Sequence, residues 1–194
     1  MGVSLSWMAV NSNMRNTAVN ALGLRLTGEY QELNEADLTA VQLPTGWFLL
    51  TLNRGDDAIM DNKLLTKISA HTELIHCMVI ENMMSSYVSS WQNGREVWSV
   101  VHYGDQDIEH LEAKGNLPAN YQQILDRALT RQAESGGKQS MVDYIFEVPV
   151  ELAESVTGYR HDKVLQGLTG KVFETLARTD ATPKRSWFRK ILGF

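Results

Sequence analysis

The sequence predicts an α+β protein built on a largely antiparallel sheet, and three observations support this fold class. Segments in which apolar and polar residues alternate, as they do in half-buried strands, recur up to about residue 114. The dipeptide Asn93-Gly94 separates two of these segments and is a preferred pair for a two-residue hairpin turn. From residue 118 onward, helical spacing of apolar residues predominates. We therefore expect an antiparallel sheet followed by C-terminal helices.

The first 83 residues predict the element order β-α-β-β-α-β. Asn11-Ser12-Asn13 supplies side chains that cap a helix, and Gly23 can end it. The residues between the second and third strands are expected to form a polar loop. Together the patterns place strands at 3–10, 24–30, 47–52 and 73–83, and helices at 14–22 and 61–68. This order is the one found in ferredoxin-like domains.

A β-hairpin is expected to extend this sheet. Its strands are 84–91 and 96–103, and a meander leads into a further strand at 107–114. A type I′ turn at Asn93-Gly94 pairs the two residues that flank it. With an uninterrupted ladder, the cross-strand pairs are Gln92–Arg95, Trp91–Glu96, Ser89–Trp98, Tyr87–Val100 and Ser85–His102. This register places four candidate binding residues on one face: Tyr87, Trp91, Trp98 and His102.

That aromatic face has two interpretations. In one, the helix expected at 118–135 covers it, and the aromatic pairs stabilise the sheet. In the other, it is a recognition surface, because amphipathic aromatic side chains combine a large contact area with a polar group. The sequence leaves both open.

The last third of the chain predicts helices. Apolar spacing places them at 118–135, 150–157 and 162–176, with an extended segment at 143–148. Between the last two helices, Tyr159-Arg160-His161-Asp162 concentrates polar side chains in one loop, where Asp162 can cap the final helix. We expect residues 1–178 to form a single α+β domain and residues 179–183 to form a linker.

Residues 184–194 predict a basic, amphipathic C-terminal tail. On a helical wheel its apolar side chains fill one arc and most of its bases lie opposite. The candidate docking residues are Arg185, Trp187, Phe188, Arg189, Ile191 and Leu192. Such a segment can pack on the chain's own acidic body, dock into a partner or a second subunit, or lie on an anionic membrane surface.

Composition bounds the class of protein. Of the 194 residues, 43% are hydrophobic and 21% are charged, as in ordinary globular proteins. The net charge is −5, and residues 183–194 contribute only positive charge, so the remaining residues carry about −9. An acidic body argues against a nucleic-acid partner. Cys77 is the only cysteine, and the sequence shows neither a signal peptide nor an apolar membrane span, so a cytoplasmic protein is expected.

Motifs for catalysis are sparse. The sequence contains no phosphate-binding loop, no G-x-S-x-G elbow and no H-E-x-x-H pair. His76 cannot serve Cys77 as a base, because adjacent strand residues point to opposite faces. His102, Asp107 and His110 could bind a divalent metal if their side chains converge. No cofactor is otherwise expected.

The sequence thus favours a non-enzymatic binding protein over an enzyme. Its partner would be another protein or a second copy of the chain, recognised through the aromatic hairpin face. Neutralising another protein, as immunity proteins do, is one form of this hypothesis, and it rests on analogy. The alternative is a small metal-dependent hydrolase that uses His102, Asp107 and His110.

Overall fold

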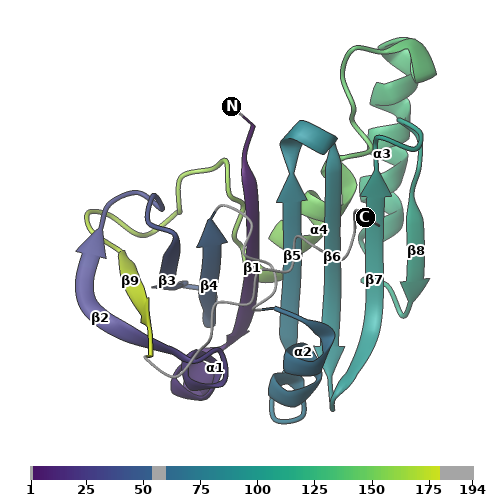
Figure 1. Ribbon diagram of the computed structural model, residues 1–194. Coiled ribbons are helices and arrows are strands. Elements are labelled where there is room, and N and C mark those ends of the chain that lie inside the picture. The colour runs from purple at the N-terminus through teal and green to yellow at the C-terminus, as the bar shows by residue number, and fades with distance from the viewer. Residues whose placement is uncertain (1, 54–59, 180–194) are drawn as a thin grey trace, which may run out of the picture.

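A computed structural model describes residues 2–53 and 60–179 of the protein, and its centre is a single nine-stranded sheet (Figure 1). Hydrogen-bonded neighbours are antiparallel throughout, in the order β2-β9-β3-β4-β1-β5-β6-β7-β8. The strands are β1 (Ser4–Asn11), β2 (Leu24–Gln31), β3 (Leu38–Gln42), β4 (Trp47–Asn53), β5 (Leu74–Ile80), β6 (Ser85–Gln92), β7 (Arg95–Tyr103), β8 (Glu112–Gly115) and β9 (Phe173–Arg178). The α-helices are α1 (Arg15–Ala21), α2 (Asn62–Ser69), α3 (Tyr121–Glu134) and α4 (Glu147–Thr157). The α+β class with a largely antiparallel sheet is confirmed.

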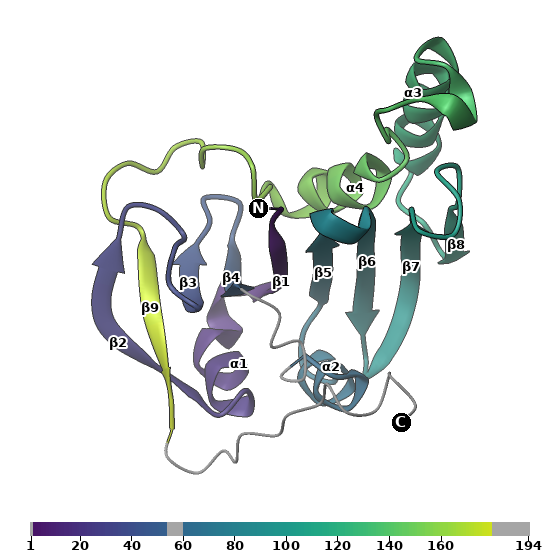
Figure 2. The same cartoon turned by 45° about the horizontal axis from the view of Figure 1, so that its top comes forward.

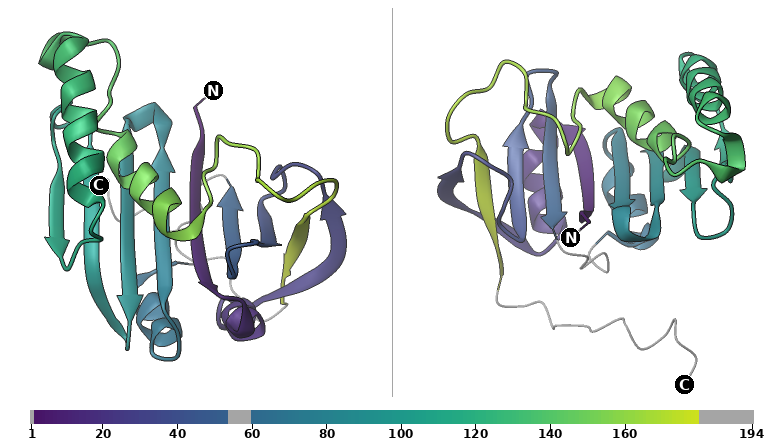
Figure 3. Two further views of the ribbon diagram at one scale, coloured as in Figure 1. Left: turned by 180° about the vertical axis from the view of Figure 1, so that it is seen from behind. Right: turned by 90° about the horizontal axis from the view of Figure 1, so that it is seen from above.

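Helices lie on both faces of the sheet. Figure 1 shows α1 and α2 on the near side, and Figure 3 shows α4 and α3 on the opposite side, over β5 to β8. Two separate clusters of buried apolar residues follow this division, one under α1 and α2 and one under α3 and α4. Strand β1 lies at the centre and contributes to both, since Met8 packs with the first cluster and Trp7 with the second. Figure 2 shows how α1 and α2 lie at one end of the strands, away from α3 and α4.

The element order expected for the first 83 residues is not confirmed, because one strand was missed there. Strand β3 occupies part of the segment expected to be a polar loop, so three strands separate α1 from α2. Strand β1 also pairs antiparallel with both β4 and β5. A ferredoxin-like sheet requires parallel pairing across its β-α-β units, which this order does not provide.

The prediction of a helix at 162–176 is wrong. Strand β9 occupies its end and inserts between β2 and β3. Within β9, the buried apolar residues divide between the two faces of the sheet, with Phe173 in one buried cluster and Leu176 in the other. This alternation is the signature of a strand covered on both sides. Two glycines in the segment, Gly167 and Gly170, adopt positive φ, which no α-helix accommodates.

The hairpin forms where the sequence predicts it. Asn93 and Gly94 have φ of 54° and 71°, as a type I′ turn requires, and Gln92 pairs with Arg95. Beyond the next pair, Trp91 with Glu96, the ladder of hydrogen-bonded pairs is interrupted, because Ser90 pairs with Trp98 and not with Val97. The intervening residue, Val97, is therefore the extra residue of a β-bulge.

The bulge overturns the predicted register beyond the turn. Because side chains alternate between faces, one extra residue moves every later side chain of β7 to the other face. Instead of the expected partners, the structure pairs Tyr87 with Val101, Ser86 with His102 and Ser85 with Tyr103. The single aromatic face does not exist.

Candidate functional site

The bulge separates the two hairpin tryptophans. Trp91 lies in the buried cluster beneath α2, where its indole Nε1 donates a 2.8 Å hydrogen bond to Ser89 Oγ. Trp98 lies in the other cluster, beneath α3 and α4. The two residues are 6% and 7% exposed, so both are part of the core. The four predicted binding residues therefore divide into two pairs, with Tyr87 and Trp91 on one face of the sheet and Trp98 and His102 on the other.

A different surface is left partly exposed on the α2 side of β5 to β8. It is formed by Met78, Ile80, Tyr87, Val101 and Tyr103, which we call the open face. Cross-strand pairing holds these side chains together, since Met78 faces Tyr87 and Tyr87 faces Val101 across one row of the sheet. In the part of the chain that the structure describes, no helix lies over this row, and Figure 1 shows the strands uncovered above α2.

Polar groups of the open face are held in fixed positions. Tyr87 donates a 3.3 Å hydrogen bond from its hydroxyl to Glu96 Oε2, and Ser99 Oγ donates a 2.8 Å bond to the other oxygen of the same carboxylate. Burial, assisted by the neighbouring Glu96 carboxylate, raises the pKa of Tyr87 above its ordinary value. The phenol therefore stays neutral and serves as a hydrogen-bonding group.

A buried histidine lies behind this surface. The ring of His76 is 5.7 Å from that of Tyr87, and its Nε2 is 3.0 Å from Ser6 Oγ. Its other nitrogen, Nδ1, is buried without a hydrogen-bond partner among the described residues. Burial lowers the pKa of His76 from 6.5 to about 4, so the imidazole is neutral at pH 7.

The predicted metal ligands serve other contacts. His102 is fully buried, and its two ring nitrogens lie 2.6 Å from the carbonyl oxygen of His110 and 2.9 Å from Asp143 Oδ2. Asp107 forms an ion pair with Lys138, whose Nζ lies 2.5 Å from Oδ2. Across residues 2–53 and 60–179, no three His, Cys, Asp or Glu side chains are arranged to hold a metal ion. His102, Asp107 and His110 therefore do not converge on a common point.

Sequence reasoning missed Asp143 as the partner of His102. The two residues are 41 positions apart, and the contact depends on the loop before α4 lying against the end of β7. Asp143 Oδ1 also accepts a 3.0 Å hydrogen bond from the backbone N–H of Phe146. An Asp four residues before a helix is a turn signal that could have indicated a structural role for this carboxylate.

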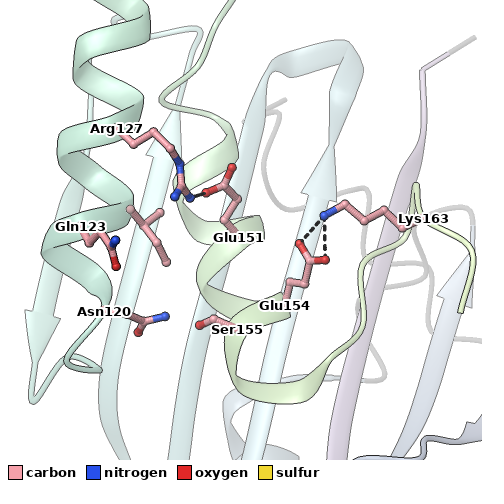
Figure 4. A pocket seen from close by; sticks show the side chains of 8 residues that line it. Asn120, Gln123, Arg127, Glu151, Glu154, Ser155 and Lys163 are labelled. Carbon is pink, nitrogen blue, oxygen red and sulfur yellow. Dashed lines mark hydrogen bonds and ion pairs between the residues drawn. The ribbon is translucent and has the colours of Figure 1, made fainter. Parts of the chain in front are cut away.

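A groove between α3 and α4 is the second candidate site. It encloses about 300 Å³ and is lined by Asn120, Gln123, Ile124, Arg127, Glu151, Glu154, Ser155 and Lys163 (Figure 4). Its cations are already paired: Arg127 binds Glu151, and Lys163 Nζ lies 2.7 Å and 2.9 Å from the two oxygens of Glu154. An ionic ligand would have to displace these partners.

The loop after α4 continues this ionic network. Arg160, whose side chain is 11% exposed, binds the carboxylates of Glu147 and Asp162. Asp162 does not cap a helix, since the described residues after it, up to 179, contain only β9. The loop thus fastens α4 to the segment that leads to β9.

Residues 184–194, where the tail docking residues are predicted, lie outside the described residues. Among the helices that are described, none combines the length and hydropathy needed to span a membrane. Comparisons of the chain with models of protein families, with curated proteins and with solved structures find no match.

Proposed function

We propose that this protein is a non-enzymatic, cytoplasmic binding protein that recognises a partner protein through the open face. The observation that carries the proposal is the apolar row Met78–Tyr87–Val101, which runs across three strands and remains partly exposed. Contiguous exposed apolar surface bounded by polar groups is typical of protein-interaction sites. Here the flanking polar group is the Glu96 carboxylate, held by Tyr87 and Ser99.

The physical character of the surface supports this use. Paired strands hold the side chains of the open face rigidly. These side chains therefore lose little conformational entropy when a partner binds. Tyr103, which is 37% exposed, adds an aromatic side chain at the end of the surface. Neutralising the partner, as an immunity protein does, remains one form of the proposal. The buried thiol of Cys77, whose pKa burial raises, is compatible with a reducing cytoplasm.

The experiment is affinity capture from the source cell with matched variants. Val101→Arg places a charge in the apolar row, and Tyr103→Ala removes the most exposed aromatic group of the surface without opening a core cavity. Leu129→Arg is the control, because Leu129 is 44% exposed and lies on α3, on the other side of the sheet.

We expect both open-face variants to lose a protein that the wild type and Leu129→Arg capture. Thermal unfolding of each variant confirms that it is folded. The proposal would be overturned if Tyr103→Ala and Val101→Arg are both folded and capture this protein as well as the wild type does.

A further inference from the structure

We infer that the C-terminal tail, residues 184–194, docks on the open face of its own chain and competes there with the partner. The inference rests on the proposed function in that both use the open face. Three observations favour this occupant: where the described chain ends, how far the remaining residues reach, and what charge they carry.

The chain leaves the fold on the side of the open face. Thr179 is fastened to Gly23, whose carbonyl oxygen accepts 2.9 Å hydrogen bonds from both the backbone N–H and the hydroxyl of Thr179. Gly23 follows α1, and α1 shares its buried cluster with α2. The open face lies on this same side of the sheet. The tail therefore does not need to pass around an edge to reach it.

The remaining residues are long enough. In the sheet order, β6 lies five positions from β9, which is about 24 Å at ~4.8 Å per strand. An extended linker of residues 180–183 spans about 13 Å at ~3.3 Å per residue. Eleven residues add about 16 Å even as a helix at ~1.5 Å per residue. A helical tail therefore reaches β5 and β6, and a tail extended at ~3.3 Å per residue also reaches β7, which lies about 29 Å from β9.

The chemistry of the two surfaces is complementary. The tail carries four basic residues and no acidic ones, together with Trp187, Phe188, Ile191, Leu192 and Phe194. The open face offers its apolar row, with the Glu96 and Glu112 carboxylates beside it. Lys114 lies 3.1 Å from Glu112 and offsets part of this charge, so Glu96 is the main electrostatic partner. In this arrangement the aromatic side chains of the tail pack on the apolar row, and its basic side chains lie near the Glu96 carboxylate.

The test uses methyl resonances of methionine in the full-length chain. Met78 lies in the open face, and Met141, which is 99% exposed in the loop after α3, is the internal control. A tail variant, Trp187→Ser with Phe188→Ser, removes two aromatic rings. We expect the Met78 methyl resonance to shift in this variant while that of Met141 stays in place, independently of protein concentration. Capture of the partner should rise several-fold.

Other outcomes overturn the inference. A Met78 shift that depends on concentration, with a doubled molecular mass, would show that the tail docks on a second copy. An unchanged Met78 resonance would show that the tail does not contact the open face. If the full-length chain also sediments with phosphatidylserine vesicles in that case, the tail binds membranes instead.

The two proposals fail separately. If the Met78 shift is seen but Val101→Arg leaves partner capture unchanged, the tail docks and the proposed function is wrong. If Val101→Arg abolishes capture but the tail variant changes neither capture nor Met78, the proposed function stands and the tail inference is wrong.

Discussion

His102 and Asp143 form a buried pair in which Nε2 of the imidazole lies 2.9 Å from Oδ2 of the carboxylate. The two side chains are 0% and 6% exposed. The other ring nitrogen lies against the carbonyl oxygen of His110, so both nitrogens of the imidazole have a hydrogen-bonding partner. The contact joins the end of β7 to the loop that leads into α4.

Removing the carboxylate of this pair should destabilise the fold strongly. Asp143→Ala leaves Nε2 of the buried imidazole without its partner and removes the acceptor of the Phe146 N–H, and each unsatisfied buried polar group costs about 1–3 kcal/mol. Urea unfolding gives the difference in free energy. Asp107→Ala is the control, because its ion pair with Lys138 is exposed and should leave the unfolding midpoint nearly unchanged. Equal midpoints for the two variants would contradict the structural role of Asp143.

Acid should destabilise the protein through His76. Its pKa is lowered by burial to about 4 in the folded state, against 6.5 for a free histidine. The unfolded chain therefore binds a proton first, and stability present above pH 6.5 is lost as the pH falls toward 4. The loss attributable to His76 is roughly 3 kcal/mol.

Denaturant unfolding at a series of pH values measures this contribution. His76→Gln retains a hydrogen-bonding group for Ser6 but cannot titrate, so its stability should fall less between pH 6.5 and pH 4. His71→Gln, at an exposed position, should retain the wild-type dependence. Identical pH profiles for wild type and His76→Gln would refute the assignment.

Gly115 should tolerate no side chain, because β8 passes close to the bulge. A Cβ at this position would lie 2.1 Å from the carbonyl oxygen of Val97, and φ is +83°. Gly28 has a similar φ of +79° with open space around it, so Gly28→Ala isolates the backbone penalty of about 1–2 kcal/mol. We expect Gly115→Ala to lower the free energy of unfolding by clearly more. Similar losses in both variants would mean that the bulge and β8 do not approach as described.

Truncating either hairpin tryptophan should affect stability first. Trp91 and Trp98 are both buried, and large-to-small changes of this kind cost about 3–5 kcal/mol. Trp91→Phe and Trp98→Phe are milder and allow a double-mutant cycle by urea unfolding. Because the side chains lie on opposite faces, we expect a coupling energy near zero. A coupling of about 1 kcal/mol, as aromatic cross-strand neighbours show, would favour the uninterrupted register instead.

Local signals in the sequence were sufficient for part of this fold. The turn at Asn93-Gly94 and the Asn11 side chain, which caps the 3-10 turn before α1, act within a few positions, so their residue types predict them. Strand β9 depends on pairing with β2, almost 150 residues earlier, and its short apolar pattern fits a helix equally well. Tertiary pairing decides between the two, and a single sequence does not display it.

The candidate site was predicted less well, and one residue accounts for most of the difference. Val97 has no feature that marks it as the extra residue of a bulge, yet it sends Trp98 and His102 to the face opposite Tyr87. Among the aromatic side chains of the hairpin strands, Tyr87 and Tyr103 are partly exposed on one face, and the expected register placed Tyr103 on the other face.

The position of β9 has a consequence for how the protein is made. Strand β2 has only β9 as a neighbour in the sheet, and β9 separates it from β3. During synthesis the ribosome completes β2 long before β9, so the nascent chain must keep β2 from pairing with β3 or with other chains. One edge of the sheet can close only when residues 173–178 have left the exit tunnel, which makes the pairing of β2 a late step of folding.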